Sequence, residues 1–273
     1  MSNPIVSVAI PGDIVHVDRD KYGNILVIDD RKHRILSFDS VFEQSKIVRA
    51  APNLPVHEYN RAMLLPVAFR EPQHVTVLGL GGGVLAHGLH KLLPKSEIQV
   101  FELREKVAEI ARKWFGLPNS NRLQVTIQDA RLAVDNLPEA STDMILTDLY
   151  SADKMSPAQA QRQFIKACSR ALTSTGWLAL NYHKMPEANG NLVRELRRQF
   201  PLLLVFRSKT NNWVIYGSKQ GFSNVKIDSS RCAELEKRLP IGWAKLRKKL
   251  EVMELREARR PSLPCSDPVS GPA

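Results

Sequence analysis

The chain has 273 residues, of which 43% are hydrophobic and 25% are charged, a balance typical of a folded globular protein and unlike that of a disordered chain. No apolar run approaches the ~18 residues that would span a bilayer, and the N-terminus does not look like a secretory signal, so we expect a cytoplasmic protein without a membrane partner. The formal net charge of +11 is spread along the chain, which leaves nucleic acid open as a partner without favouring it.

The first part of the chain predicts short strands followed by one helix. Strands are expected within residues 5–38, with a polar turn at 29–34 between two apolar runs, as in a β-hairpin. Apolar residues then recur at helical spacing over residues 59–69. We therefore predict an N-terminal β-hairpin domain at residues 1–58 and a helix that leads into the next domain.

From residue 75 the pattern changes to alternating strands and helices. Apolar runs predict strands at 75–78, 98–101, 123–127, 144–147 and 177–180. This alternation predicts an α/β domain, at residues 59–220, whose parallel sheet has helices on both faces. Two more strands, at 202–206 and 213–216, are expected to close the sheet as an antiparallel pair.

The C-terminal part is predicted to be a helical tail at residues 221–260. Trp243, Leu246, Leu250 and Met253 have the spacing of one face of an amphipathic helix, which would pack on its own domain or on a second copy of the chain. A homodimer is therefore left open. Residues 261–273, rich in proline and serine, are predicted to be disordered.

A glycine cluster follows the strand at 75–78 and precedes a helical pattern. Gly79, Gly81, Gly82 and Gly83 would let the backbone turn sharply and approach a ligand closely. A dinucleotide-binding turn needs glycine or alanine where this chain has Val84, so binding of a nicotinamide or flavin dinucleotide is disfavoured.

Three acidic residues that follow this turn in the sequence each stand at or just after the end of a predicted strand. Glu102 ends the second strand, 23 residues after Gly79, while Asp129 follows the third strand and Asp148 the fourth. Each alone could cap a helix. The carboxyl ends of parallel strands converge on one crevice, however, so the three together predict a site for a nucleoside.

At this point the chain resembles the spermidine synthase (polyamine aminopropyltransferase) family, as a divergent member. The segments VLGLGGGVLAHGLHKLLP, IQVFELREKVAEIARKWF, RLQVTIQDARLAV and DMILTDLY resemble its nucleotide-binding core, and YGNILVIDD, RILSFDSVFEQS and EYNRAMLLPVAF resemble its N-terminal β-domain. The resemblance covers about residues 20–220. It implies a Rossmann-like, seven-stranded methyltransferase-type sheet, with S-adenosylmethionine or decarboxylated S-adenosylmethionine as co-substrate.

Spacing and resemblance together give a list of expected site residues. The donor site would consist of Gly79, Gly81, Gly82, Gly83, Glu102, Asp129, Ala130 and Asp148. In the family pattern Glu102 would hold the ribose, and Asp129 with Ala130 would flank the adenine. The resemblance places Gln44 and Tyr59 near the substrate, although Tyr59 fits helix packing equally well. The histidines and cysteines form no metal-binding pattern, so no metal is expected.

Two departures from the family pattern concern the chemistry. Val84 stands where the family's GGGDGG loop has an aspartate, and Ser151 stands at the second acid of its D-x-x-D-P loop. The candidate catalytic residues are therefore Asp148, Asp153 (two positions late) and Tyr150. Carboxylates are the natural partners of cationic amines, so the loss of two weakens the case for a polyamine substrate.

Three functions follow. The family default is aminopropyl transfer from decarboxylated S-adenosylmethionine to a polyamine, with a small-molecule amine or another acceptor as partner. The second is methyl transfer from S-adenosylmethionine to an unknown acceptor. The third is a non-catalytic homologue that binds a nucleotide, RNA or a protein.

Overall fold

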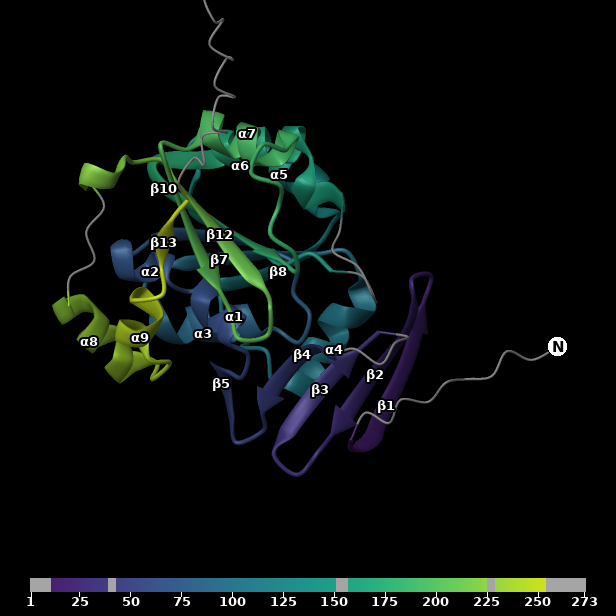
Figure 1. Cartoon of the computed structure of the whole chain (residues 1–273). Coiled ribbons are helices and arrows are strands. Elements are labelled where there is room, and N and C mark those ends of the chain that lie inside the picture. Colours follow the sequence, from purple (N-terminus) through teal and green to yellow (C-terminus); the bar gives the residue numbers. More distant parts are fainter. Residues whose placement is uncertain (1–10, 39–42, 151–156, 225–228, 254–273) are drawn as a thin grey trace, which may run out of the picture.

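The computed structural model describes residues 11–38, 43–150, 157–224 and 229–253, which form two sheets and the helices that cover them (Figure 1). The N-terminal sheet is antiparallel, in the order β1 (Asp13–Asp20), β2 (Gly23–Asp29), β3 (His33–Ser37), β4 (Glu43–Val48) and β5 (Ala51–Pro55). The expected hairpin is confirmed, since β2 and β3 pair antiparallel with Asp29 opposite Arg34.

The large sheet has eight strands in the order β13-β11-β12-β10-β9-β6-β7-β8. Their bounds are β6 (His74–Leu78), β7 (Glu97–Glu102), β8 (Leu123–Ile127), β9 (Thr142–Thr147), β10 (Leu172–Tyr182), β11 (Leu202–Arg207), β12 (Trp213–Ser218) and β13 (Glu251–Val252). Strands β6 to β10 pair parallel, and β12 pairs antiparallel with β10 and β11. The α/β class and the seven-stranded core are thus confirmed, with β13 added at one edge.

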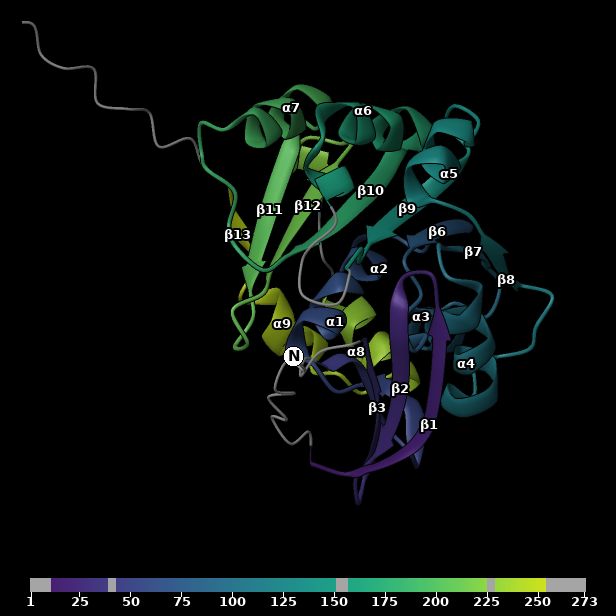
Figure 2. The same ribbon diagram turned by 90° about the vertical axis from the view of Figure 1, so that its right-hand side faces the viewer.

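Helices cover both faces of the large sheet, as Figure 2 shows. One face carries α5 (Ala130–Asn136), α6 (Arg162–Ala171) and α7 (Asn191–Gln199), and the other carries α1 (Glu58–Met63), α2 (Pro66–Phe69), α3 (Val84–Leu92), α4 (Glu105–Phe115), α8 (Ser229–Arg238) and α9 (Trp243–Arg247). Two short 3₁₀ turns lie at Pro157–Ala160 and Phe222–Asn224. Each face has its own apolar core cluster, so the sheet is buried on both sides.

The helix expected at residues 59–69 is divided in two. Helix α1 ends at Met63 and α2 begins at Pro66, with 3₁₀-type bonds at the junction, where the N–H groups of Leu64 and Leu65 donate to the carbonyls three residues earlier. Pro66 has no N–H to donate to the carbonyl of Ala62, which interrupts the helical hydrogen bonds, and it takes the first position of α2 instead.

The predicted C-terminal helix is wrong in its second half. Trp243 and Leu246 are buried against the core as expected, but α9 ends at Arg247. The chain then extends as β13, whose Glu251 and Val252 pair antiparallel with β11. The open edge of β11 offers backbone hydrogen bonds that the side-chain periodicity does not reveal.

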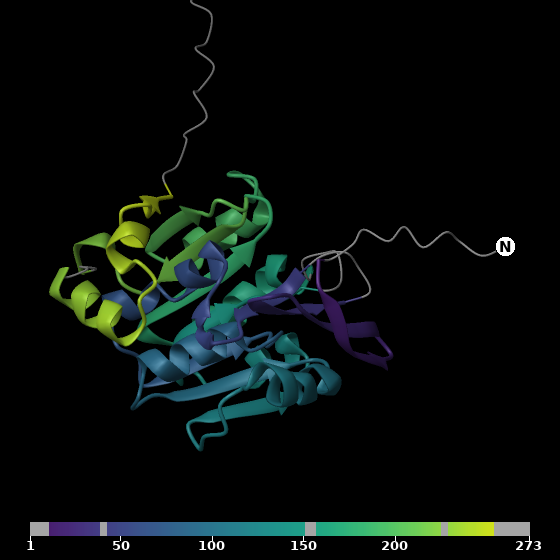
Figure 3. The ribbon, with the colours of Figure 1, turned by 90° about the horizontal axis from the view of Figure 1, so that it is seen from below.

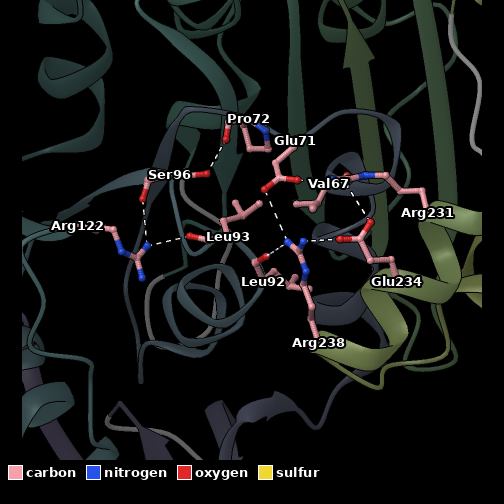
Figure 4. A network of polar contacts seen from close by, with 10 residues as sticks. All are labelled: Val67, Glu71, Pro72, Leu92, Leu93, Ser96, Arg122, Arg231, Glu234 and Arg238. Atoms are coloured by element: carbon pink, nitrogen blue, oxygen red, sulfur yellow. Dashed lines mark hydrogen bonds and ion pairs between the residues drawn. The ribbon is translucent and has the colours of Figure 1, made fainter.

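Helix α8 is tied to the body of the protein by arginines (Figure 4). Arg238 donates to the carbonyl of Leu92 at 3.0 Å and pairs with Glu71 and Glu234. Arg231 pairs with Glu71 at 3.1 Å. These contacts hold the C-terminal helices against the end of α3 and the segment that follows α2.

The two sheets share a core. Ile25, Val27 and Leu36 of the N-terminal sheet pack in one apolar cluster with Val107 and Phe115 of α4. The N-terminal strands accordingly lie alongside the large-sheet domain when it is viewed from below (Figure 3). The predicted domain boundaries stay predictions. Within the described residues, no helix is long and apolar enough to cross a membrane.

Candidate active site

A cleft of about 830 Å³ lies where the carboxyl ends of β6, β7, β8 and β9 face the N-terminal sheet and α1. Its volume is in the range of cavities that bind small molecules. The large sheet contributes Gly79, Glu102 and Asp148 from strand ends, and β4 contributes Gln44 and Ser45 from the opposite side. The cleft therefore has one wall from each sheet.

The glycine turn is shaped by close contacts within the protein. Gly79, Gly81 and Gly83 have φ of +94°, +53° and +78°, in the left-handed region that glycine tolerates best. A Cβ at Gly79 would lie 2.4 Å from the Asp148 carbonyl oxygen, and one at Gly81 would lie 2.5 Å from Ser45 Oγ. The turn thus packs directly on the end of β9 and on β4.

The four glycines do not have the same surroundings. Gly79 and Gly81 line the cleft, whereas Gly82 and Gly83 are not among its described lining residues. The Gly82 N–H donates to Ser45 Oγ at 2.9 Å, and a Cβ at Gly83 would meet Leu117. The structure therefore brings two of the four predicted donor-binding glycines to the cleft and places the other two against protein.

Glu102 connects the glycine turn to the end of β7. Its side chain is buried and accepts the N–H groups of Leu80 and Arg104, each at 2.9 Å, through different carboxylate oxygens. Burial raises the pKa of Glu102, and these backbone donors oppose that rise. A carboxylate held this way keeps lone pairs that can accept hydrogen bonds from vicinal hydroxyl groups of a ligand.

Asp129 both caps a helix and lines the cleft. It is the N-cap of α5 and accepts the Arg131 N–H at 2.8 Å, as the capping alternative expects. The Arg131 guanidinium also donates to both carboxylate oxygens and thereby lowers the pKa of Asp129. Ala130 lines the cleft beside it.

Asp148 is oriented by a chain of amides. Asn181 Nδ2 donates to Asp148 Oδ1 at 2.8 Å, and Asn181 Oδ1 accepts from Asn212 Nδ2 at 3.1 Å. Burial raises the pKa of the Asp148 carboxyl to about 6, against the opposing effect of the Asn181 hydrogen bond. The Asp148 carboxyl therefore ionises at a higher pH than an exposed aspartate does.

Tyr59, Tyr150, His57 and His183 line the same cleft as Asp148. Tyr150 stacks on His183 with 4.4 Å between ring centroids, and its hydroxyl donates to the Asn181 carbonyl at 3.1 Å. Tyr59 stacks on His57 at 5.8 Å. Burial, followed by the charge of Asp148, raises the pKa of both tyrosines, so their hydroxyls stay protonated.

Glu43, a second carboxylate of this cleft, is already paired. Its carboxylate lies 3.5 Å from His57 Nε2 and 2.8 Å from Lys46 Nζ. The hydrogen bond with His57 is the main cause that lowers the pKa of Glu43 to about 2. Glu43 is therefore ionised, and its charge is largely balanced by neighbours.

Most of the predicted site residues meet in this one cleft. Gly79, Gly81, Glu102, Asp129, Ala130, Asp148, Tyr150, Gln44 and Tyr59 all line it. The predicted catalytic residue Asp153 lies outside the described residues, as does Ser151. Sequence reasoning missed Ser45, His57, Asn181 and Asn212, of which Asn181 follows a predicted strand end and could have been found by the same reasoning as the acids.

The fold and this cleft define a Rossmann-like protein of the methyltransferase type with a nucleoside-sized site at the strand ends. Residues 57–226 match the spermine/spermidine synthase domain, and the chain belongs to this family.

Curated relatives include both aminopropyltransferases and methyltransferases. The chain is 26% identical over 177 residues to a polyamine aminopropyltransferase of Vibrio vulnificus, covering 62% of this chain and 58% of the relative. It is 32% identical over 170 residues to the human eEF1A lysine and N-terminal methyltransferase, covering 55% of this chain and 24% of the relative. The chain thus matches less than two thirds of the length of either relative.

Solved structures show the same two groups. A probable spermidine synthase from Corynebacterium glutamicum has a TM-score of 0.70 at 22% identity, covering 86% of this chain and 93% of that one. Human methyltransferase-like protein 13, solved in complex with SAH, has a TM-score of 0.56 at 27% identity, covering 70% and 92%.

Proposed function

We propose that this chain is a transferase that binds an S-adenosylmethionine-type donor in the cleft and transfers an alkyl group from its sulfonium to an amine. The observation that carries the proposal is the convergence of Gly79, Glu102, Asp129 and Asp148 on one cleft of about 830 Å³. The family default is aminopropyl transfer to a polyamine.

The buried carboxylate of Glu102 would accept hydrogen bonds from the two ribose hydroxyls, and Asp129 with Ala130 would flank the adenine. The sulfonium end would then point toward Asp148, whose negative charge favours a cation. The donor supplies an electrophilic carbon bonded to positively charged sulfur.

In the transfer, the amine lone pair attacks this carbon and the carbon–sulfur bond breaks, leaving both bonding electrons on a neutral thioether sulfur. The attacking nitrogen must lose one proton, and the Asp148 carboxylate, with a pKa of about 6, is placed to accept it or to stabilise the ammonium. The Asn181–Asn212 pair orients that carboxylate. Tyr150 would contact the acceptor, and Asp153 remains a proposed second acid.

Methyl transfer is the second candidate, and one observation specifically favours it. Val84 is 4% exposed and lines the cleft at the position where the family pattern has an aspartate. Without that acid, the carboxylate of S-adenosylmethionine meets less repulsion. The similarity to human methyltransferase-like protein 13, solved with SAH, agrees with this reading.

Titration calorimetry with S-adenosylmethionine, decarboxylated S-adenosylmethionine and methylthioadenosine tests the proposal. Mass spectrometry of products with an amine acceptor then separates aminopropyl transfer, which releases methylthioadenosine, from methyl transfer, which releases S-adenosylhomocysteine. If none of the three compounds binds, the transferase proposal is wrong and a non-catalytic role replaces it.

Val84→Asp, compared with the neutral Val84→Asn, tests the donor choice. We expect Val84→Asp to lower affinity for the carboxylated donor about tenfold or more relative to Val84→Asn, because the added charge repels the donor carboxylate. An equal effect of both variants would mean that residue 84 does not face that end of the donor.

A further inference from the structure

A second concavity of about 750 Å³ lies away from the cleft and has no role in the proposed reaction. We call it the basic groove; its lining residues come from the segments 31–34, 47–52 and 114–116. The Arg49 N–H donates to the Lys32 carbonyl at 2.9 Å, which holds the β2–β3 and β4–β5 turns side by side. Arg34 Nη1 donates to the Trp114 carbonyl at 2.5 Å and attaches the end of α4.

The rim of the basic groove is positively charged. Among the described residues that line it, Arg31, Lys32, Arg34 and Arg49 are basic and none is acidic. Asp29, beside the groove, is bound by Arg34 at 2.6 Å and 2.7 Å and lies 3.7 Å from Arg49. The exposed side chains of Arg31 and Lys32 have no ion-pair partner in the described part of the chain, so their charge is available to a ligand.

The floor of the basic groove is apolar. Val48 and Pro52 are half-buried and contribute carbon surface between the charged turns, whereas Ile47 and Phe115 are buried beneath them. Trp114 lines the groove as well, and its buried indole Nε1 has no hydrogen-bond partner among the described residues. A ligand that suits this groove is anionic, has an apolar part, and brings oxygen atoms that can accept hydrogen bonds.

These features favour a peptide over a nucleic acid. Single-stranded nucleic acid is generally bound by aromatic faces on which bases stack. The Trp114 ring is already stacked with His16 at 5.2 Å and lies 5.3 Å from the Arg34 guanidinium, and Phe115 is buried. Carboxylates suit the exposed rim, and an apolar side chain suits the floor.

We propose that the basic groove binds an acidic peptide segment of a protein partner, with an apolar side chain placed between its carboxylates. The carboxylates pair with Arg31, Lys32 and Arg49, and the apolar side chain covers the floor at Val48 and Pro52. The proposal does not depend on the proposed function, because none of the described residues that line the groove also lines the cleft.

The test is fluorescence anisotropy with a labelled short peptide of Asp and Glu around one Phe. We expect Arg31→Glu/Lys32→Glu to weaken binding by about tenfold or more, since two attractive charges become repulsive. The matched control Lys91→Glu/Lys95→Glu changes the net charge equally on exposed residues outside the groove and should change binding less than about twofold.

A second variant guards against misfolding of the first. Ala50→Glu places one negative charge on an exposed lining residue and should also weaken binding. A peptide with Ala in place of Phe should bind more weakly, because the floor then stays uncovered. Equal losses in the groove variants and the control, equal binding of the two peptides, or tighter binding of a uridine-only RNA would each overturn the proposal.

Discussion

The cleft and the basic groove have similar volumes, about 830 and 750 Å³, but the described lining of the cleft has more acidic residues than arginines, whereas that of the groove has basic residues and no acidic ones. The same two elements reach both. Strand β4 lines the cleft with Glu43 and the groove with Val48. Helix α4 is roughly 16 Å long; Arg104, at its N-terminal end, lines the cleft, and Gly116, at its C-terminal end, lines the groove. The same strand and helix thus contribute residues to two sites that differ in charge.

The difference lies in how each charge is held. In the cleft, Glu102 is buried and accepts two backbone N–H groups, and Asp148 is fixed by an amide. In the groove, Arg31 and Lys32 project into solvent. Buried, oriented carboxylates suit chemistry on one bound molecule, whereas exposed cations suit recognition of a surface and are weakened by salt. The predictions below test this separation.

We expect the largest effect from Asp148→Asn. The amide cannot accept a proton or balance an ammonium, so turnover should fall by about 10²- to 10⁴-fold. The measurement is the initial rate of thioether product formation by mass spectrometry. Asp135→Asn, at an exposed acid on α5, is the matched control and should keep the wild-type rate. Turnover by Asp148→Asn at the control rate would remove Asp148 from the mechanism.

The pH dependence of the rate is the second test. The pKa of Asp148 is raised to about 6, so its carboxyl group is mostly charged well above that pH and loses its charge as the pH falls through it. A plot of log kcat/KM against pH should therefore rise, and its slope below about pH 6 should exceed its slope above that pH by one log unit per pH unit. Any remaining slope would come from the acceptor amine, which must also lose its proton.

The Asp148→Asn variant is the control for the pH profile. It should keep only the slope that belongs to the acceptor and show no break near pH 6. A break that persists in the variant would assign that titration to another group, such as His183, whose pKa is lowered by burial.

The sequence predicts the large sheet well, because strands buried on both faces are continuous apolar runs. The strands expected at 75–78, 98–101 and 144–147 match β6, β7 and β9 within two residues, whereas β10 begins five residues before the expected strand. The strand expected at 123–127 has the same bounds as β8, an edge strand whose apolar and polar residues alternate. It predicts β13 and the break at Pro66 poorly. A two-residue edge strand depends on the exposed edge of β11, and the helical spacing of apolar residues continues past a proline that interrupts the helical hydrogen bonds.

The residues of the candidate site also divide into those that the sequence predicts and those that it does not. Glu102, Asp129 and Asp148 could be predicted because each follows a strand of a parallel sheet, and such strand ends meet. Ser45 and Asn212 could not. Ser45 reaches the glycine turn from another sheet, and Asn212 reaches Asn181 from the β11–β12 turn, so only tertiary packing brings them together.

Glu102→Gln should have a smaller effect than Asp148→Asn. It should lower the affinity for the donor more than it lowers the turnover rate. Gln keeps one acceptor oxygen but loses the charge, and hydrogen bonds to charged groups contribute ~1.5–3 kcal/mol, so donor affinity should fall roughly 10- to 100-fold. Titration calorimetry with methylthioadenosine measures this affinity in the absence of turnover. Glu105→Gln, at the exposed first residue of α4, is the matched control. Equal affinities in both variants would place the ribose elsewhere.

We expect the smallest effect when a substitution in one site is tested for its influence on ligand affinity at the other site. Arg31→Glu/Lys32→Glu should change methylthioadenosine affinity by less than about twofold, because exposed charges farther apart than a Debye length of about 10 Å are largely screened. Glu102→Gln should equally leave the acidic peptide's affinity unchanged. A larger reciprocal change would mean that the sites are coupled, since coupling in binding free energy must be equal in both directions. The elements to examine would then be β4 and α4, which reach both sites.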